Sequence, residues 1–284
     1  FFSSKGLSEE ANGILASTTW IAVWWITEAI PIAATALLPI ILFPLSGSLN
    51  ITSTTASFGH KFVFLYLGGF IIAIAIEKWN LHKRIALNII NLIGSDIKKI
   101  ILGFMLATAF LSMWISNTAT SVMMLPIGIA IISQLKDNPG TKKDENLIFG
   151  KALMLAIAYS ASIGGIATLI GTPPNLVLAG IVSETYGYEI TFSQWFIFGF
   201  PISVLLLFIC WKYLTTFAFS FSQKEFPGGK QEIKHLMQSL GKMTYEEKTV
   251  AIIFAATAFC WITRSYLLKE ILPQIDDTII AILF

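Results

Sequence analysis

The polar residues that could do chemistry are concentrated in one short run. Ser116, Asn117 and Thr118 interrupt an apolar stretch, 100–133. Ser112 lies one helical turn before Ser116, so both hydroxyls can face the same point. These side chains offer the hard oxygen ligands that suit Na⁺ and bring no full charge into a membrane. A helix ending before the run would add free carbonyls for a cation, and a helix starting in it would add free N–H groups for a carboxylate. The run therefore predicts a combined cation and oxyanion site, although the same residues would also cap a kinked helix.

A second interruption follows in the next apolar stretch, 151–181. Residues 151–163 predict a helix, and the glycines at 164 and 165 permit unwinding. Gly171-Thr172-Pro173-Pro174-Asn175 then removes two backbone donors before the apolar run resumes. Irregular backbone at membrane depth requires protein or water around its polar groups, and interrupted helices mark binding sites in transporters. The second break thus favours a binding site over a simple cap.

Other kinds of chemistry find no support. The sequence contains no phosphate-binding glycine loop, no G-x-S-x-G motif, no zinc-protease motif and no intramembrane pair of carboxylates. His60, His82 and His235 are separate from one another, and Cys210 and Cys260 lie in long apolar runs. We therefore expect no metal site, no disulfide, no catalytic residue and no enzyme activity.

The elements that must position the polar run are membrane helices. Of the 284 residues, 55% are hydrophobic and 13% are charged, whereas soluble domains carry about 25% charged residues. This excludes a soluble enzyme, a disordered chain and a nucleic-acid binder, and predicts an all-α polytopic membrane protein. The net charge of +2 is too small to imply an acidic partner. The apolar stretches cover roughly 13–30, 31–45, 61–77, 100–133, 151–181, 192–219 and 248–268.

The basic residues between these stretches predict the topology. By the positive-inside rule, three polar stretches are cytoplasmic. Their basic residues are Lys78, Lys83, Arg84, Lys98 and Lys99; Lys136, Lys142, Lys143 and Lys151; and Lys212, Lys224, Lys230, Lys234, Lys242 and Lys248. Stretches 46–59 and 182–194 contain no Lys or Arg and are predicted to be external, as is 265–276, where Arg264 and Lys269 run against the rule.

This topology places both ends of 100–133 in the cytoplasm. The part before the polar run has about 16 residues, or about 24 Å of helix, which is short for a membrane span. A re-entrant hairpin is therefore favoured over two full spans. Two amphipathic segments, 81–97 and 230–240, are predicted in the cytoplasm, where each could rest on anionic lipid or pack against the protein itself.

The run Trp114–Pro126 resembles the first Ser-Asn-Thr signature of the divalent anion:sodium symporter (DASS) family, which includes bacterial and animal dicarboxylate and citrate carriers. Gly164–Asn175 resembles the loop that breaks the fifth helix of that family, and Trp24–Pro31 with Thr35–Pro39 resembles its early spans. The three matches occur in the family's order over more than half of the chain, and together they are specific.

The resemblance implies a homodimeric, inverted-repeat transporter with an elevator-like movement. By position, Ser112, Ser116 and Asn117 would coordinate Na⁺ as the co-transported ion, and Gly165 would add a backbone carbonyl. Asn117 and Thr118 would contact a substrate carboxylate. The loop Thr172, Pro173, Pro174 and Asn175 would shape the cavity.

The resemblance also suggests how the chain is divided. Residues 1–99 would hold scaffold helices and the amphipathic helix 81–97. Residues 100–220 would hold the transport elements, namely the hairpin 100–135, the broken helix 151–182 and the long helix 192–219. An amphipathic connector would cover 221–245, and 246–284 would begin the second-repeat scaffold. The family has a second Ser-Asn-Thr run and a second broken helix, which this sequence lacks, so we expect a piece of a longer chain with the first repeat mostly present and the second largely missing.

The expected function is sodium-coupled symport of C4-dicarboxylates such as succinate across a bacterial cytoplasmic membrane. The expected partners are the dicarboxylate, sodium ions, the lipid bilayer and a second copy of the chain, with no nucleic acid. A sodium-independent dicarboxylate exchanger, a carrier of sulfate-like inorganic anions and a non-transporting membrane subunit remain as alternatives.

Overall fold

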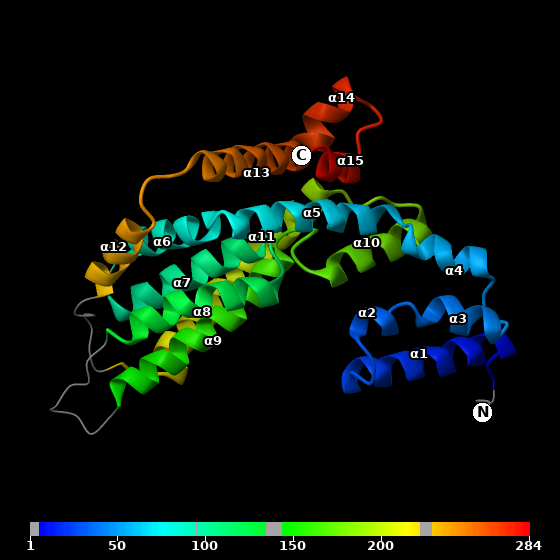
Figure 1. Ribbon diagram of the computed structural model, residues 1–284, viewed down its shortest axis with the longest axis horizontal. Helices are drawn as coiled ribbons and strands as arrows, with labels where there is room; N and C mark the ends of the chain where they lie inside the picture. The colour runs from blue at the N-terminus through cyan, green and yellow to red at the C-terminus, as the bar shows by residue number, and fades with distance from the viewer. Residues whose placement is uncertain (1–5, 95, 135–143, 222–228) are drawn as a thin grey trace. The chain divides into compact units, whose positions relative to one another are not determined.

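Every regular element in the described part of the chain is a helix. A computed structural model describes residues 6–94, 96–134, 144–221 and 229–284, and these ranges contain no strand (Figure 1). The predicted cytoplasmic residues Lys136, Lys142, Lys143 and Lys224 lie outside the described residues. The chain divides into two compact units, Phe1–Phe64 and Leu65–Phe284.

The first unit contains one helix of 19 residues and three shorter ones, the last of which lies in the stretch 46–59 between two apolar stretches. Its helices are α1 (Glu9–Thr27), α2 (Ile32–Thr35), α3 (Leu38–Leu45) and α4 (Ile51–Phe58). The Ser8 side chain caps α1 by accepting from the backbone N–H of Ala11 at 3.2 Å. Stretch 31–45 forms two helices rather than one, and Pro39 lies in the first turn of the second, where proline is tolerated.

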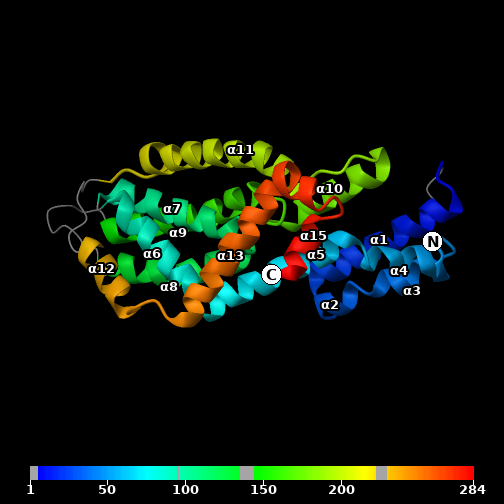
Figure 2. The same cartoon turned by 90° about the horizontal axis from the view of Figure 1, so that it is seen from above.

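The second unit contains the polar run and the remaining helices, except for the first four residues of α5, which belong to the first unit. These helices are α5 (Lys61–Lys78), α6 (Leu81–Ile93), α7 (Ile97–Ser112), α8 (Asn117–Ile132), α9 (Glu145–Ile166), α10 (Pro173–Tyr186), α11 (Phe192–Lys212) with its π-helical continuation η1 (Tyr213–Ala218), α12 (Gly229–Ser239), α13 (Tyr245–Thr263) with η2 (Arg264–Leu268), α14 (Lys269–Ile271) and α15 (Asp277–Leu283). Helices α7, α8 and α9 pack side by side, with α6 against α7 and α11 against α9 (Figures 1 and 2).

The lengths of the helices agree with a membrane protein. Among the described residues, four helical stretches are long and apolar enough to cross a bilayer: Ile51–Lys78, Glu145–Ile166, Phe192–Ala218 and Tyr245–Ile271. Together with the composition, this confirms the prediction of an all-α polytopic membrane protein.

Helices α7 and α8 form a hairpin around the polar run. Each helix has 16 residues, or about 24 Å, and residues 113–116 connect them. Helix α7 begins and helix α8 ends at the same end of the unit (Figures 1 and 2). Helix α9 packs against both arms, so the tip of the hairpin is held inside the second unit.

The two amphipathic segments pack against the protein. Helix α6 contacts α7, and its buried residues include His82, Ala86 and Ile90. Arg84 binds Glu247 of α13 through two contacts of 3.1 and 3.0 Å. Helix α12 contacts α6 and α8, and its Ile233 is 2% exposed.

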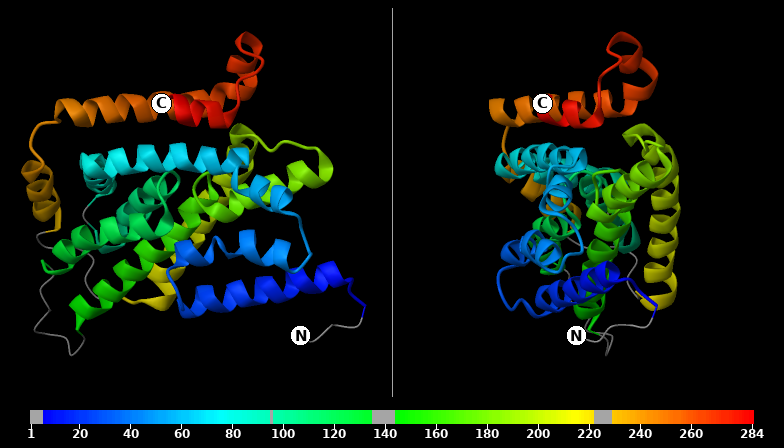
Figure 3. Two further views of the ribbon diagram at one scale, coloured as in Figure 1. Left: turned by 45° about the vertical axis from the view of Figure 1, so that its right-hand side comes forward. Right: turned by 90° about the vertical axis from the view of Figure 1, so that its right-hand side faces the viewer.

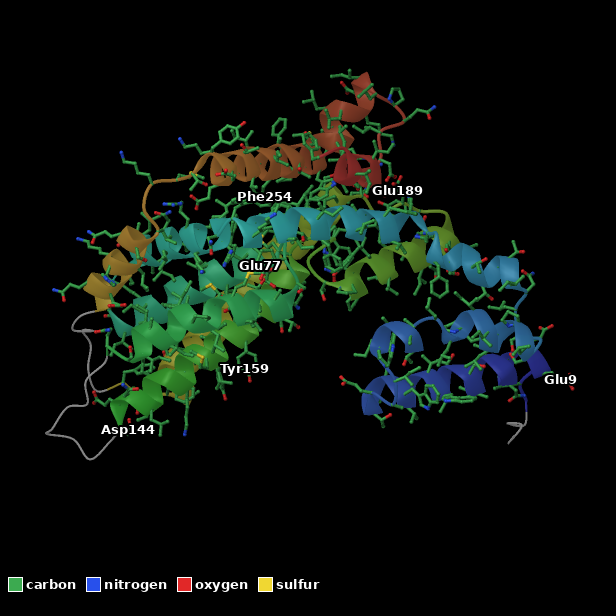
Figure 4. The ribbon with its side chains drawn as sticks, viewed as in Figure 1. Glu9, Glu77, Asp144, Tyr159, Glu189 and Phe254 are labelled. Carbon is green, nitrogen blue, oxygen red and sulfur yellow. The ribbon has the colours of Figure 1, made fainter. Side chains whose placement is uncertain are left out.

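Arg264, which runs against the positive-inside rule, is buried. Its side chain is 3% exposed and forms ion pairs with Asp277 at 2.8 Å and with Glu189 at 3.3 Å. Figure 4 labels Glu189 close to the region where α13 ends. The charge of Arg264 is therefore compensated inside the folded protein by two carboxylates. Asp277, in the first turn of α15, is the nearer of these two partners.

Candidate functional site

The tip of the hairpin brings a serine and an asparagine together. The Ser112 hydroxyl oxygen lies 2.8 Å from Oδ1 of Asn117 and 2.7 Å from the backbone carbonyl oxygen of Ala161 in α9. Ser112 is fully buried and Asn117 is half-buried. Because a hydroxyl has one hydrogen, Ser112 can donate to only one of these two oxygens, unless the Asn117 amide is turned so that its nitrogen faces Ser112. The oxygens of Ser112, Asn117 and Ala161 thus share a single hydrogen, and a bound cation would stabilise the contact that this hydrogen cannot serve.

Ser116 has the role of a helix cap. Its backbone is extended, and its hydroxyl accepts from the backbone N–H of Ala119 at 3.3 Å. The capping interpretation is therefore correct for this serine, whose side chain is still half-exposed beside Asn117. Thr118, predicted to contact substrate, is exposed in the first turn of α8.

Gly165 lies directly against Asn117. A Cβ atom at position 165 would stand 2.4 Å from Oδ1 of Asn117, so a side chain there would displace the asparagine. The Gly165 carbonyl accepts from Nδ2 of Asn175 at 2.9 Å, and its second lone pair is left for another partner. A Cβ atom at Gly171 would stand 2.5 Å from the same oxygen, so glycine at that position keeps the carbonyl uncovered.

Helix α9 continues through both glycines, in contrast to the expected unwinding at 164. It ends at Ile166, residues 167–172 form the break, and α10 starts at Pro173. Gly164 serves close packing instead, because a Cβ atom there would lie 2.3 Å from the carbonyl oxygen of Ala109 in α7. Figure 3 shows α10 leaving the break as a separate helix.

The side chains of Asn175 and Thr168 hydrogen-bond within the break and connect it to the hairpin. Asn175, buried at the start of α10, donates to Gly165 and also to the carbonyl of Thr168 at 2.8 Å. The Thr168 hydroxyl donates to the carbonyl of Met113 in the hairpin tip. Thr168 was not among the predicted site residues, because neither its type nor its spacing distinguishes it from a loop threonine.

The remaining predicted loop residues lie at the edge of this cluster. Thr172 is half-buried and caps α10 without a side-chain hydrogen bond. Pro173 and Pro174 are exposed in the first turn of α10, where proline costs no helical hydrogen bond. The structure thus brings Ser112, Asn117, Gly165 and Asn175 together and leaves the two prolines outside.

The cluster contains no ionisable side chain, so it would recognise ions through neutral oxygens and N–H groups. Within the described ranges, no group of three or more His, Cys, Asp or Glu residues could hold a metal ion. His82 is buried, with its Nδ1 3.3 Å from the carbonyl oxygen of Ile76, and burial lowers the pKa of its imidazole. Its place on α6 gives it no part in the hairpin tip.

The fold and the site define a class: a multi-pass α-helical membrane protein whose candidate site is built from interrupted helices, as in secondary transporters. Comparison with known proteins then gives the family. The chain belongs to the family described as the sodium:sulfate symporter transmembrane region, whose family model matches residues 3–284. This confirms the resemblance to the DASS family, whose description is that of a transporter and not of an enzyme.

Two relatives illustrate the similarity. The sodium-dependent dicarboxylate transporter SdcS of Staphylococcus aureus (strain USA300) is 50% identical over 286 residues, which cover 99% of this chain and 55% of the relative. The protein of the same name from Staphylococcus saprophyticus is 50% identical over 271 residues, 95% of this chain and 52% of the relative. The chain therefore spans about half the length of these curated relatives.

Proposed function

We propose that the protein is a sodium-coupled symporter of C4-dicarboxylates such as succinate in the cytoplasmic membrane of a bacterium. The observation that carries this proposal is the group of oxygens from Ser112, Asn117 and Ala161 at the hairpin tip, beside the carbonyl of Gly165. The names of the relatives, which are sodium-dependent dicarboxylate transporters, support it.

In this proposal Na⁺ binds on the α9 side of the hairpin tip. Ser112, Ser116 and Asn117 supply side-chain oxygens, and Gly165 supplies its carbonyl. The negative ends of α7 and α9 favour a cation at this point, because the carbonyls of a last helical turn carry partial negative charge. The carbonyl of Ala161, which already contacts Ser112, is a further candidate ligand.

The dicarboxylate binds at the start of α8. One carboxylate accepts from Asn117, from Thr118 and from the backbone N–H groups of the first turn, where the helix dipole favours an anion. The break at 167–172 and the loop Thr172–Asn175 line the cavity. The second carboxylate is bound by the part of the transporter that lies outside this chain, and the whole protein works as a homodimer with an elevator-like movement.

Coupling follows from the position of Asn117, which serves both ligands. Sodium binds first and fixes the Asn117 side chain and the tip of the hairpin. The dicarboxylate then binds this ordered form more tightly than the sodium-free form, so each ligand raises the affinity for the other.

The description of the family favours one alternative substrate, an inorganic dianion such as sulfate. Both substrates would use the N–H groups of α8, but a C4-dicarboxylate reaches a second cluster of donors that sulfate cannot reach at the same time. An excess of sulfate that fails to inhibit succinate uptake would favour the dicarboxylate, and inhibition at equal concentration would favour the inorganic anion.

The test is succinate uptake by the full-length protein in liposomes, with and without an inward sodium gradient. We expect uptake to require the gradient and to fall about tenfold or more in Asn117→Ala, because hydrogen bonds to charged groups contribute about 1.5–3 kcal/mol each. Asn91→Ala in α6, a half-buried asparagine far from the hairpin tip, is the matched control and should keep its uptake. Uptake that is indifferent to sodium, or equal in the two variants, would refute the proposal.

A further inference from the structure

Helix α11 presents a polar seam to the end of α9. Trp195, Gly199 and Ser203 recur every four residues and therefore share one face of α11. The Trp195 indole N–H donates to the carbonyl of Ile166 at 2.9 Å, and the Ser203 hydroxyl donates to the carbonyl of Ile163 at 2.8 Å. A Cβ atom at Gly199 would lie 2.6 Å from the Ile166 oxygen, so glycine at this position permits the close approach.

This seam completes the hydrogen bonding of the broken helix. The last four carbonyls of an α-helix have no partner within the helix. In α9 the carbonyl of Gly164 accepts from the backbone N–H of Ala167 at 3.0 Å, and that of Gly165 accepts from Asn175. The other two, on Ile163 and Ile166, accept from Ser203 and Trp195. Helix α11 thus provides half of the donors that hold the α9 end in place.

From this arrangement we propose that Trp195 is a positioning residue for the cation site. Its indole N–H holds the carbonyl of Ile166, which belongs to the peptide unit next to the Gly165 carbonyl. The two planar peptide units are joined only through the φ and ψ angles of Ile166, which are helical, so fixing one unit limits the orientations of the other. Trp195 thereby holds the Gly165 carbonyl in a fixed position relative to Oδ1 of Asn117, although it does not contact the ion itself.

The inference rests on the proposed sodium site and deepens it. It gives α11 the role of positioning the end of α9, although the polar residues of α11 belong to no recognisable sequence motif. It also separates the two ligands, because Trp195 bonds to the α9 end that would hold sodium and makes no hydrogen bond to α8, where the carboxylate would bind.

Trp195→Phe tests the proposal, since it keeps an aromatic ring and removes the N–H. In the full-length protein in liposomes, the sodium concentration for half-maximal succinate uptake should rise about threefold to tenfold, the effect of losing one buried hydrogen bond. The KM for succinate at saturating sodium should stay within about twofold of the wild type. A merely structural role would lower the maximal rate without moving the sodium dependence alone.

Trp211→Phe is the matched control. Trp211 lies on the same helix, is also half-buried, and donates its indole N–H to the carbonyl of Lys98 at 3.0 Å, away from the α9 end. This variant should keep the wild-type sodium dependence. Ser203→Ala provides a second test, with a smaller shift in the same direction as Trp195→Phe, should the tryptophan variant fail to fold.

A second measurement distinguishes this inference from the proposed function. Sodium that binds the folded protein should raise its unfolding temperature in detergent, by an amount that grows with the sodium concentration relative to its Kd. If the wild type shows neither this stabilisation nor sodium-dependent uptake, the proposed function fails. If the wild type shows both and Trp195→Phe matches Trp211→Phe in its sodium dependence, the role of Trp195 alone is refuted.

Discussion

The Thr168 side chain joins the break after α9 to the hairpin tip. Its hydroxyl donates to the carbonyl of Met113, and the residue is fully buried. We expect Thr168→Val, which preserves the shape, to leave that carbonyl without its donor and to loosen the tip. An unpaired buried polar group costs about 1–3 kcal/mol, so succinate uptake at limiting sodium should fall several-fold.

The conservative variant separates the hydroxyl from the volume of this side chain. Thr168→Ser keeps the donor and should retain most of the uptake, measured in the same liposomes at the same sodium concentration. If the serine variant were as impaired as the valine variant, the methyl group rather than the hydrogen bond would be the important feature.

For single residues, the sequence predicts only contacts between side chains that lie close together along the chain. Ser112 and Asn117 could be placed together because both lie within a turn of the hairpin tip. The bonds from Ser112 to Ala161 and from Trp195 to Ile166 cross between helices distant in sequence, by 49 and 29 residues. No local periodicity encodes such pairs, so they required the structure.

Among the elements, α9 illustrates why a glycine pair is ambiguous. Glycine permits unwinding, but it equally permits a helix to approach its neighbour, and only the neighbour decides. Here α7 lies against Gly164, and α9 stays helical to Ile166. The break itself was predictable from the two prolines, and the hairpin from its short arms, whereas the exact end of α9 was not.

Because α7 packs closely against α9, we expect Gly164→Ala to destabilise the folded protein. The added methyl group would lie 2.3 Å from a backbone oxygen, which cannot move without shifting α7. Overpacking of this kind costs about 1–3 kcal/mol, so the unfolding temperature in detergent should fall and sodium-dependent uptake should decrease with it.

Gly150→Ala on the same helix is the matched control. Its Cβ atom would meet only side-chain atoms of Ile132, at 3.5 to 4.0 Å, which is ordinary van der Waals contact. Alanine in place of glycine within a helix should stabilise the protein by about 0.4–1 kcal/mol. Equal destabilisation by the two variants would show that α7 does not approach α9 as closely as described.

Across the whole second unit, aromatic rings tie the hairpin tip to α13. Trp114 stacks on Trp261 with ring centres 6.4 Å apart and meets Phe254, labelled in Figure 4, edge-on at 5.0 Å. Phe192 of α11 stacks against both tryptophans, with ring centres 6.0 Å from Trp114 and 5.2 Å from Trp261. The proposed elevator movement of the hairpin relative to α13 would have to break these contacts, which places part of its barrier in this cluster.

The distribution of charge makes the final prediction, which concerns the topology of the chain. The end of α10 should face the outside, and α12 should face the cytoplasm, because basic residues surround α12 and are absent from 182–194. The two segments lie at opposite ends of the second unit (Figures 1 and 2).

Single cysteines at exposed positions test this topology after Cys210 and Cys260 have been replaced by serine. A membrane-impermeant maleimide should label Thr185→Cys in intact cells, whereas Gln238→Cys should react only after the membrane is permeabilised. The reverse pattern would invert the chain in the membrane and place the open end of the hairpin outside. Labelling of both positions in intact cells would contradict a membrane between the two ends of the unit, and with it the assignment of the hairpin as re-entrant.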